Sequence, residues 1–241
     1  AARLPRNPAT AAHPPTAKQA KAPEMSAWTT AVLNTFLTWA ERGGHAHRPA
    51  WHLLAHTGMR RGEALALRWR DVDLDAGTVR VRRSAGMIRN AGEGAEVTEG
   101  DTKSGKPRVV DVDPATSAVL RAHRKARGAM ALQLARDDAL VLADHEGRHL
   151  QPEHFSRSFT DALRRCGKQL GAAAPPAIRL HDLRHTHATV LLSAGVPVHV
   201  VSQRLGHASP VVTLTVYAHV VPGSQREAAE MFARLVAGAA S

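Results

Sequence analysis

The sequence predicts a mainly α-helical protein that also contains one small antiparallel β-sheet, an α+β fold. Apolar residues recur with helical spacing over most of the chain, a periodicity typical of amphipathic helices packed on a core. Valines alternate with charged residues in only two short stretches, TVRV and RVVDVD, and this pattern indicates half-buried strands. The 241 residues, 44% of them hydrophobic, are sufficient for a sizeable core in one domain.

The first 25 residues are expected to form a flexible basic linker. Residues 1–25 contain five prolines and four lysines or arginines, without apolar periodicity. They lack the continuous apolar segment of a signal peptide, and no stretch of the chain approaches the roughly 18 apolar residues of a membrane span. Residues 26–241 are therefore assigned to the folded domain.

Three helices are predicted before the sheet. The first follows Ser26 and ends at the Gly43-Gly44 pair, because glycine interrupts helical propagation. Two shorter helices are expected over about 49–56 and 61–68. The apolar face of the first helix is predicted from residues at helical spacing, namely Trp28, Val32, Leu33, Phe36, Leu37 and Ala40.

The sheet is predicted in the middle of the chain. Its outer strands are expected around 79–82 and 110–112, with a middle strand near 96–101 and Gly/Glu-rich loop sequence in between. The Ser-Gly step in TKSGKPR suits a hairpin turn.

The remainder of the chain is predicted to be helical. Asp113-Pro114 is an N-cap followed by a proline at the first helical position, and Gly195 and Gly206 suit left-handed helix ends. Cys166, the single cysteine, excludes an internal disulfide and is expected in the core. Helices are expected over about 114–135, 152–171, 181–194, 197–205, 211–217 and 225–236, the last with Ala228, Met231, Phe232 and Leu235 directed inward.

The charge of the chain points to a polyanionic partner. Lysines and arginines number 32 against 21 acidic residues, a net charge of +11 with a pI near 11.0. Aromatic residues make up only 4% of the sequence, and no basic amphipathic helix has an aromatic-rich face. A nucleic acid is therefore favoured over a membrane surface as the partner, and a cytoplasmic location is expected.

Several residues have the spacing of an anion site. His181 and Arg184 lie three residues apart at a predicted helix start, where free backbone N–H groups favour anions. The alternative is that His181 caps the helix and Arg184 only extends along its surface. Arg60 follows a Thr-Gly turn and could clamp phosphate oxygens together with Arg184. Tyr217 is the only tyrosine and is a competent nucleophile toward phosphorus when positive groups surround it.

Five motifs occur in a fixed order along residues 57–219. They are T-G-x-R-x-x-E (57–63), T-K-S-G-K (102–106), H-x-L-R-H-T-x-A-T (181–189), L-G-H (205–207) and Y-x-H (217–219). Together they closely resemble the catalytic domain of tyrosine recombinases of the phage-integrase type. This resemblance implies the DNA breaking–rejoining enzyme catalytic-domain fold.

The resemblance also implies a role for each matching residue. Arg60 and Arg184 would hold the scissile phosphate, and Tyr217 would be the nucleophile. His181 would bond a non-bridging oxygen or assist proton transfer, and His207 matches the histidine or tryptophan of the third position.

Two further positions follow from the same resemblance. Lys103 matches the hairpin lysine that protonates the leaving 5′-hydroxyl, and its neighbour Lys106 is a rival for that role. Glu63 matches a supporting acidic position that is structural rather than reactive.

The implied activity is site-specific recombination of double-stranded DNA through a covalent 3′-phosphotyrosine intermediate, without metal, ATP or another cofactor. The implied assembly is a tetramer on DNA and a monomer without it, with accessory DNA-bending proteins, in the nucleoid of a bacterial cytoplasm. Family members usually carry an N-terminal core-binding domain, so residues 1–25 are interpreted as the linker that leads from it. The C-terminal helix would either dock on a neighbouring protomer in trans or fold back.

Two other functions are compatible with parts of the sequence. A non-catalytic DNA-binding module on the same scaffold would have the same charge. A metal-dependent hydrolase would use His181 and His185, which have the i, i+4 spacing of metal ligands, but the sequence lacks the H-E-x-x-H glutamate and an obvious third ligand.

Overall fold

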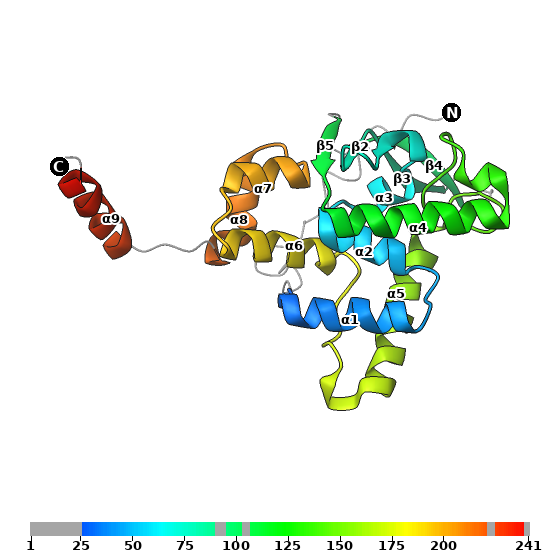
Figure 1. Ribbon diagram of the computed structural model, residues 1–241, viewed down its shortest axis with the longest axis horizontal. Coiled ribbons are helices and arrows are strands. Elements are labelled where there is room, and N and C mark those ends of the chain that lie inside the picture. Colours follow the sequence, from blue (N-terminus) through cyan, green and yellow to red (C-terminus); the bar gives the residue numbers. More distant parts are fainter. Residues whose placement is uncertain (1–25, 90–94, 103–106, 221–224, 239–241) are drawn as a thin grey trace, which may run out of the picture.

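A computed structural model describes residues 26–89, 95–102, 107–220 and 225–238. Helices form most of it, and two small antiparallel sheets lie along one side of the long helix α4 (Pro114–Met130) (Figure 1). The predicted α+β class is confirmed. Within these described ranges no helix combines the length and the apolar character that crossing a bilayer would require.

The main core is built by α1 (Thr30–Arg42), α2 (Arg48–Thr57) and α5 (Pro152–Leu170). Helix α1 begins where the Thr29 hydroxyl accepts a hydrogen bond from the Val32 amide, and it ends at Gly43. Phe36, fully buried, packs against Trp51 and Phe159, whose ring centroids are 5.4 and 5.3 Å from its own. Cys166 is also fully buried, as predicted.

The sheets differ from the prediction. Strands β1 (Val72–Asp73), β2 (Thr78–Val81) and β5 (Arg108–Asp111) form one sheet, in which β2 pairs directly with β5. The expected middle strand is β4 (Ala95–Asp101), and it pairs instead with β3 (Arg83–Arg89), a strand that the sequence analysis assigned to a loop.

The β3–β4 pair escaped detection because it lacks alternating apolar residues. Of its side chains, Ala85 is buried, whereas Val79, Val81 and Val110 of the other sheet are nearly inaccessible. Ion pairs attach it to the body: Arg83 contacts Asp71 at 2.5 Å, and Glu99 contacts Arg68 at 2.6 Å. Charged side chains therefore do here what an apolar face does in β2 and β5.

Two helices end earlier than predicted. Helix α3 (Arg61–Leu65) stops before position 68 because the chain turns to pair with the segment at 137–139. The Trp69 amide donates to the Ala139 carbonyl at 3.1 Å and the Arg70 amide to the Asp137 carbonyl at 2.7 Å. Helix α4 ends at Met130 rather than 135, and a short 3₁₀ turn over Leu132–Ala135 follows.

A second, smaller core joins α6 (Asp182–Ser193), α7 (Val198–Leu205) and α8 (Pro210–Tyr217). Gly195 and Gly206 adopt positive φ angles of 81° and 69°, which confirms their predicted left-handed conformations. The buried members of this core are Ala188, Leu192, Val201, Leu205 and Tyr217.

The burial predicted for the apolar face of helix α9 (Gln225–Gly238) is wrong. Met231, Phe232 and Leu235 are 57%, 70% and 67% exposed, and the helix stands apart from the body of the molecule (Figure 1). An amphipathic pattern predicts that a face will be covered but does not identify the covering surface. The side chain of Ala228 lies outside the described part.

Candidate active site

Arg60 is held at the junction between α2 and α3. Gly58 adopts a φ of 65° at the end of α2, and a Cβ at this position would lie only 2.7 Å from side-chain atoms of both His187 and Leu205. After this turn the Arg60 amide donates to Glu63 Oε2 at 2.8 Å and its Nη1 donates to Oε1 at 2.9 Å. Its Nη2 donates to the Gly206 carbonyl at 3.2 Å.

Glu63 is the buried carboxylate that organises this part of the site. It is 1% exposed and accepts two hydrogen bonds from Arg108, at 2.9 and 2.7 Å. Burial alone would raise the pKa of Glu63. The hydrogen bonds and positive charge of Arg108, followed by those of Arg60, outweigh burial and lower the pKa. Glu63 is therefore ionised at neutral pH.

Arg108 was missed by the sequence analysis. It also donates from Nε to the Arg204 carbonyl at 3.0 Å, and its guanidinium lies where a Cβ on Gly206 would approach to 2.7 Å. A signal was present: Arg108 shares a face of β5 with buried Val110. An arginine on the buried face of a strand needs a carboxylate partner.

Arg184 extends from the first turn of α6 and is 4% exposed. Its Nη1 donates to the Gly58 carbonyl at 2.6 Å and to the Leu205 carbonyl at 2.8 Å. Its buried Nη2 has no hydrogen-bond partner among the described residues. Burial first, and then the charge of Arg60, lowers the pKa of Arg184 to about 10, so it remains protonated at neutral pH.

His207 lies directly after the Gly206 turn. Its Nδ1 is 2.8 Å from the Thr213 hydroxyl of α8. Burial lowers the pKa of His207 to about 4, with further lowering by the charges of Arg184, Arg60 and Arg108. The three guanidinium groups thus lie within electrostatic range of one imidazole, which is neutral at pH 7.

Tyr217 ends α8 and is 1% exposed. Its hydroxyl is 2.6 Å from Nδ1 of His185. Burial raises the pKa of Tyr217 to about 12, although the charge of Arg184 opposes this rise. His185 belongs to a quoted motif but was weighed only as a metal ligand, so its contact with the tyrosine was not foreseen.

His181 precedes α6 and makes no side-chain capping bond. Its exposed ring meets that of His185 edge to face, with centroids 5.1 Å apart. Desolvation by surrounding atoms, followed by the charges of His185 and Arg184, lowers the pKa of His181 to about 4. In the described ranges, no group of three His, Cys, Asp or Glu side chains is arranged to hold a metal ion.

The structure therefore brings most of the predicted residues to one place. Arg60, Glu63, Arg184 and His207 meet where the Gly58 turn faces the Gly206 turn, and His181 and Tyr217 adjoin them through His185. Lys103 and Lys106 lie outside the described residues, between β4 and β5.

Comparison with known sequences assigns the family. The profile of the phage integrase family matches residues 28–223. The chain belongs to the phage integrase family. Two relatives in this family are the tyrosine recombinase XerC-like protein of Caldanaerobacter subterraneus, 27% identical over 78% of this chain, and the integrase of Mycobacterium phage FRAT1, 32% identical over 68%.

The fold agrees with the assignment. The Tn1549 transposon integrase, solved in complex with transposon right end DNA, superposes with a TM-score of 0.72 at 19% identity, over 90% of this chain and 67% of that one. The present chain spans about half the length of its relatives, 49% of the XerC-like protein and 46% of the FRAT1 integrase. This integrase-family chain thus has the catalytic-domain fold that its motifs predicted.

Proposed function

We propose that this integrase-family chain is the catalytic domain of a site-specific DNA recombinase that cleaves and rejoins strands through Tyr217. The observation that carries the proposal is the guanidinium of Arg184. It is 4% exposed, two backbone carbonyls fix its Nη1, and its Nη2 is unpartnered within the described residues. A buried unpaired donor is costly, and a DNA phosphate oxygen would satisfy it.

The charge balance of the cluster supports the same ligand. Arg60, Arg108 and Arg184 contribute three positive charges, and Glu63 is the carboxylate that they surround. Two positive charges remain uncompensated, which suits one phosphodiester and the additional negative charge that develops during its cleavage. Each of the three guanidinium nitrogens of Arg108 already donates a hydrogen bond, to Glu63 or to the Arg204 carbonyl, so Arg60 and Arg184 are the proposed phosphate ligands.

The proposed reaction begins at Tyr217. Its oxygen attacks phosphorus while its proton passes to Nδ1 of His185, which lies 2.6 Å away. The bond between phosphorus and the 5′-oxygen breaks, and Lys103 donates a proton to that oxygen. The products are a 3′-phosphotyrosine and a free 5′-hydroxyl, and attack by a second strand's hydroxyl reverses the step. The covalent link conserves the phosphodiester bond energy, so the scheme needs no metal or ATP.

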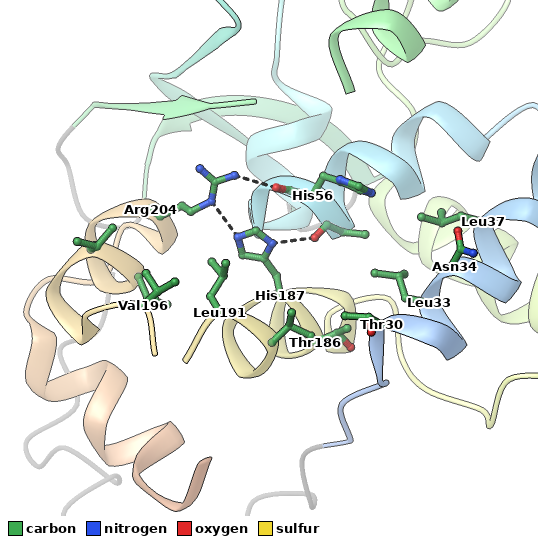
Figure 2. A pocket seen from close by; sticks show the side chains of 14 residues that line it. Thr30, Leu33, Asn34, Leu37, His56, Thr186, His187, Leu191, Val196 and Arg204 are labelled. Carbon is green, nitrogen blue, oxygen red and sulfur yellow. Dashed lines mark hydrogen bonds between the residues drawn. The ribbon is translucent and has the colours of Figure 1, made fainter. Parts of the chain in front are cut away.

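We further propose that α9 mediates assembly on DNA, with a tetramer as the active form. A groove of about 540 Å³ lies between α1, α6 and α7 (Figure 2). Most of its lining is apolar, including Leu33, Leu191 and Val196. The exposed apolar face of α9, with Phe232 and Leu235, matches it in character, so α9 of one copy would occupy the groove of the next.

Covalent capture tests the reaction. The protein, expressed from its complete reading frame, is incubated with duplexes that contain a randomised segment and a nick. Because of the nick, the short fragment bearing the free 5′-hydroxyl diffuses away after cleavage. Adducts that survive SDS are recovered and sequenced. We expect wild type to retain one family of sequences covalently and Tyr217→Phe to retain none.

Two outcomes contradict the proposal. If wild type binds a defined sequence without forming an adduct, the chain is a non-catalytic DNA-binding module. If Tyr217→Phe still forms the adduct, another residue is the nucleophile. Phe232→Asp tests assembly separately: it should abolish the tetramer on the selected DNA, observed by analytical ultracentrifugation, while a single site is still bound.

A further inference from the structure

His187 and Arg204 form a polar contact that lies outside the proposed phosphate cluster. Nε of Arg204 donates to Nε2 of His187 at 2.9 Å, and Nδ1 of His187 donates to the Ala55 carbonyl at 2.9 Å. Arg204 also donates from Nη2 to the His56 carbonyl and from Nη1 to the Asp111 carbonyl, both at 2.9 Å. Figure 2 shows the pair from the groove side, with dashed lines to the two α2 carbonyls.

These bonds fix the histidine in one tautomer. A carbonyl only accepts, so Nδ1 of His187 must carry the proton, and Nε2 is then free to accept from Arg204. Burial, followed by the charge of Arg204, lowers the pKa of His187 to about 3, so the ring stays neutral throughout the physiological range. The hydrogen bond therefore joins the charged guanidinium of Arg204 to a neutral imidazole, and it persists across the physiological pH range.

The pair connects the two turns whose carbonyls the proposed phosphate ligands Arg60 and Arg184 contact. The carbonyls of Ala55 and His56 lie in the last turn of α2, immediately before Gly58. The His187 ring packs so closely on that turn that a Cβ at Gly58 would come within 2.7 Å of it. Arg204 lies in the last turn of α7, immediately before Gly206.

We propose that His187 and Arg204 are positioning residues for DNA cleavage, because together they fix the Gly58 turn against the Gly206 turn. The separation of these turns sets the distance between the guanidinium of Arg60, which bonds the Gly206 carbonyl, and that of Arg184, which bonds the carbonyls of Gly58 and Leu205. Neither member of the pair is among the proposed phosphate ligands. This inference rests on the proposed function of the cluster.

The test measures cleavage rate separately from DNA binding. Single-turnover adduct formation is followed at saturating suicide duplex, and affinity is measured by fluorescence anisotropy. We expect His187→Phe and Arg204→Ala each to slow the rate about 10- to 100-fold, because a displacement of about 1 Å can cost that much, while affinity stays near wild type. The double variant should be no slower than the slower single variant, because both remove the same link.

Two variants control for general effects. His187→Asn places an amide N–H near the position of Nδ1 and should recover part of the rate. His199→Gln changes an exposed histidine on α7 and should cleave at the wild-type rate. Wild-type rates in His187→Phe, or equal losses of rate and affinity in both single variants, would overturn the inference.

A second measurement uses only the wild-type protein and does not depend on its activity. Long-range ¹H–¹⁵N NMR of the wild-type protein should report His187 with its proton on Nδ1 at every pH from 8 to 5. If the His187 ring titrates near its ordinary pKa, or carries its proton on Nε2, the proposed hydrogen bond from Arg204 to His187 is wrong. If wild type forms no adduct, the proposed function fails; if wild type cleaves and the variants match it, this inference alone fails.

Discussion

The two apolar cores differ in what holds them together. The core of α1, α2 and α5 is built from large aromatic rings in direct contact, with Phe36 packed against Trp51 and Phe159. The core of α6, α7 and α8 contains small aliphatic side chains around Tyr217. Arginines connect the two regions through backbone carbonyls: Arg60 to Gly206, Arg184 to Gly58 and Arg204 to His56.

We infer from this difference that the aromatic core mainly determines stability and that the junction between the regions mainly determines the cleavage rate. Rings in direct contact hold the aromatic core together, whereas hydrogen bonds from charged arginines to backbone carbonyls add directional contacts between the regions. Since Arg60 and Arg184 both bridge the regions and are the proposed phosphate ligands, binding of phosphate would tighten the same contact. Substitutions in the aromatic core should therefore change stability, and those at the junction should change the cleavage rate.

The largest effect is expected at Tyr217. Tyr217→Phe removes the proposed nucleophilic oxygen and should abolish covalent adduct formation completely. The ring still fills the second core, so only the hydrogen bond to His185 is lost, and the unfolding free energy should fall by about 1 kcal/mol. Gel analysis of SDS-treated suicide reactions and urea denaturation measure the two effects; a residual adduct would contradict the assignment.

Phe36→Ala should lower stability and leave the cleavage rate unchanged. Removal of this fully buried ring leaves a cavity in the aromatic core, and the expected loss of stability is about 3–5 kcal/mol. The cleavage rate per folded molecule should remain close to wild type. Chemical denaturation and active-site titration in the same samples would test this, and a rate that falls with the cavity would show that the two regions are not separable.

Arg60→Ala should slow cleavage by about 10²–10³-fold, the usual cost of removing one charge-stabilising donor. Its effect on stability should be small, because the side chain is 25% exposed and Glu63 keeps both hydrogen bonds to Arg108. Arg148→Ala, at an exposed ion pair elsewhere, is the matched control and should cleave normally. Equal cleavage rates in Arg60→Ala and Arg148→Ala would show that Arg60 does not act in the site.

The stability of the protein should also depend on pH. The folded-state pKa of His187 is about 3, below its ordinary value of 6.5. Between these two pH values the unfolded chain therefore binds a proton that the folded chain does not bind. Stability from this group is complete above pH 6.5 and is lost progressively as pH falls toward 3. His187→Phe should flatten the fall of the melting temperature between pH 6.5 and 4; an unchanged slope would contradict the buried neutral ring.

The sequence predicted the parts of this molecule whose signals are local. The helix start at Asp113-Pro114 and the helix end at Gly206 appear where expected. Of the motif residues, Arg60, Arg184 and His207 lie close together, whereas Lys103 lies outside the described residues. Strand β3 could not be predicted, because ion pairs rather than alternating apolar residues support it. The exposure of α9 could not be predicted, because an amphipathic pattern does not identify a covering surface. The alternation in β5 indicated that Arg108 needs a buried partner. The identity of that partner and the His187–Arg204 pair depend on contacts between residues far apart in the chain, which periodicity cannot reveal.

The central claim is that Arg184 acts by balancing charge on a DNA phosphate, and one measurement addresses it directly. Arg184→Ala and wild type are compared on suicide duplexes whose scissile group is either the natural phosphate or an uncharged methylphosphonate. On phosphate the variant should be about 10²–10³-fold slower than wild type, and on methylphosphonate that deficit should shrink by about tenfold or more. An equal deficit on both substrates would contradict the claim, because Arg184 would then only hold the fold together.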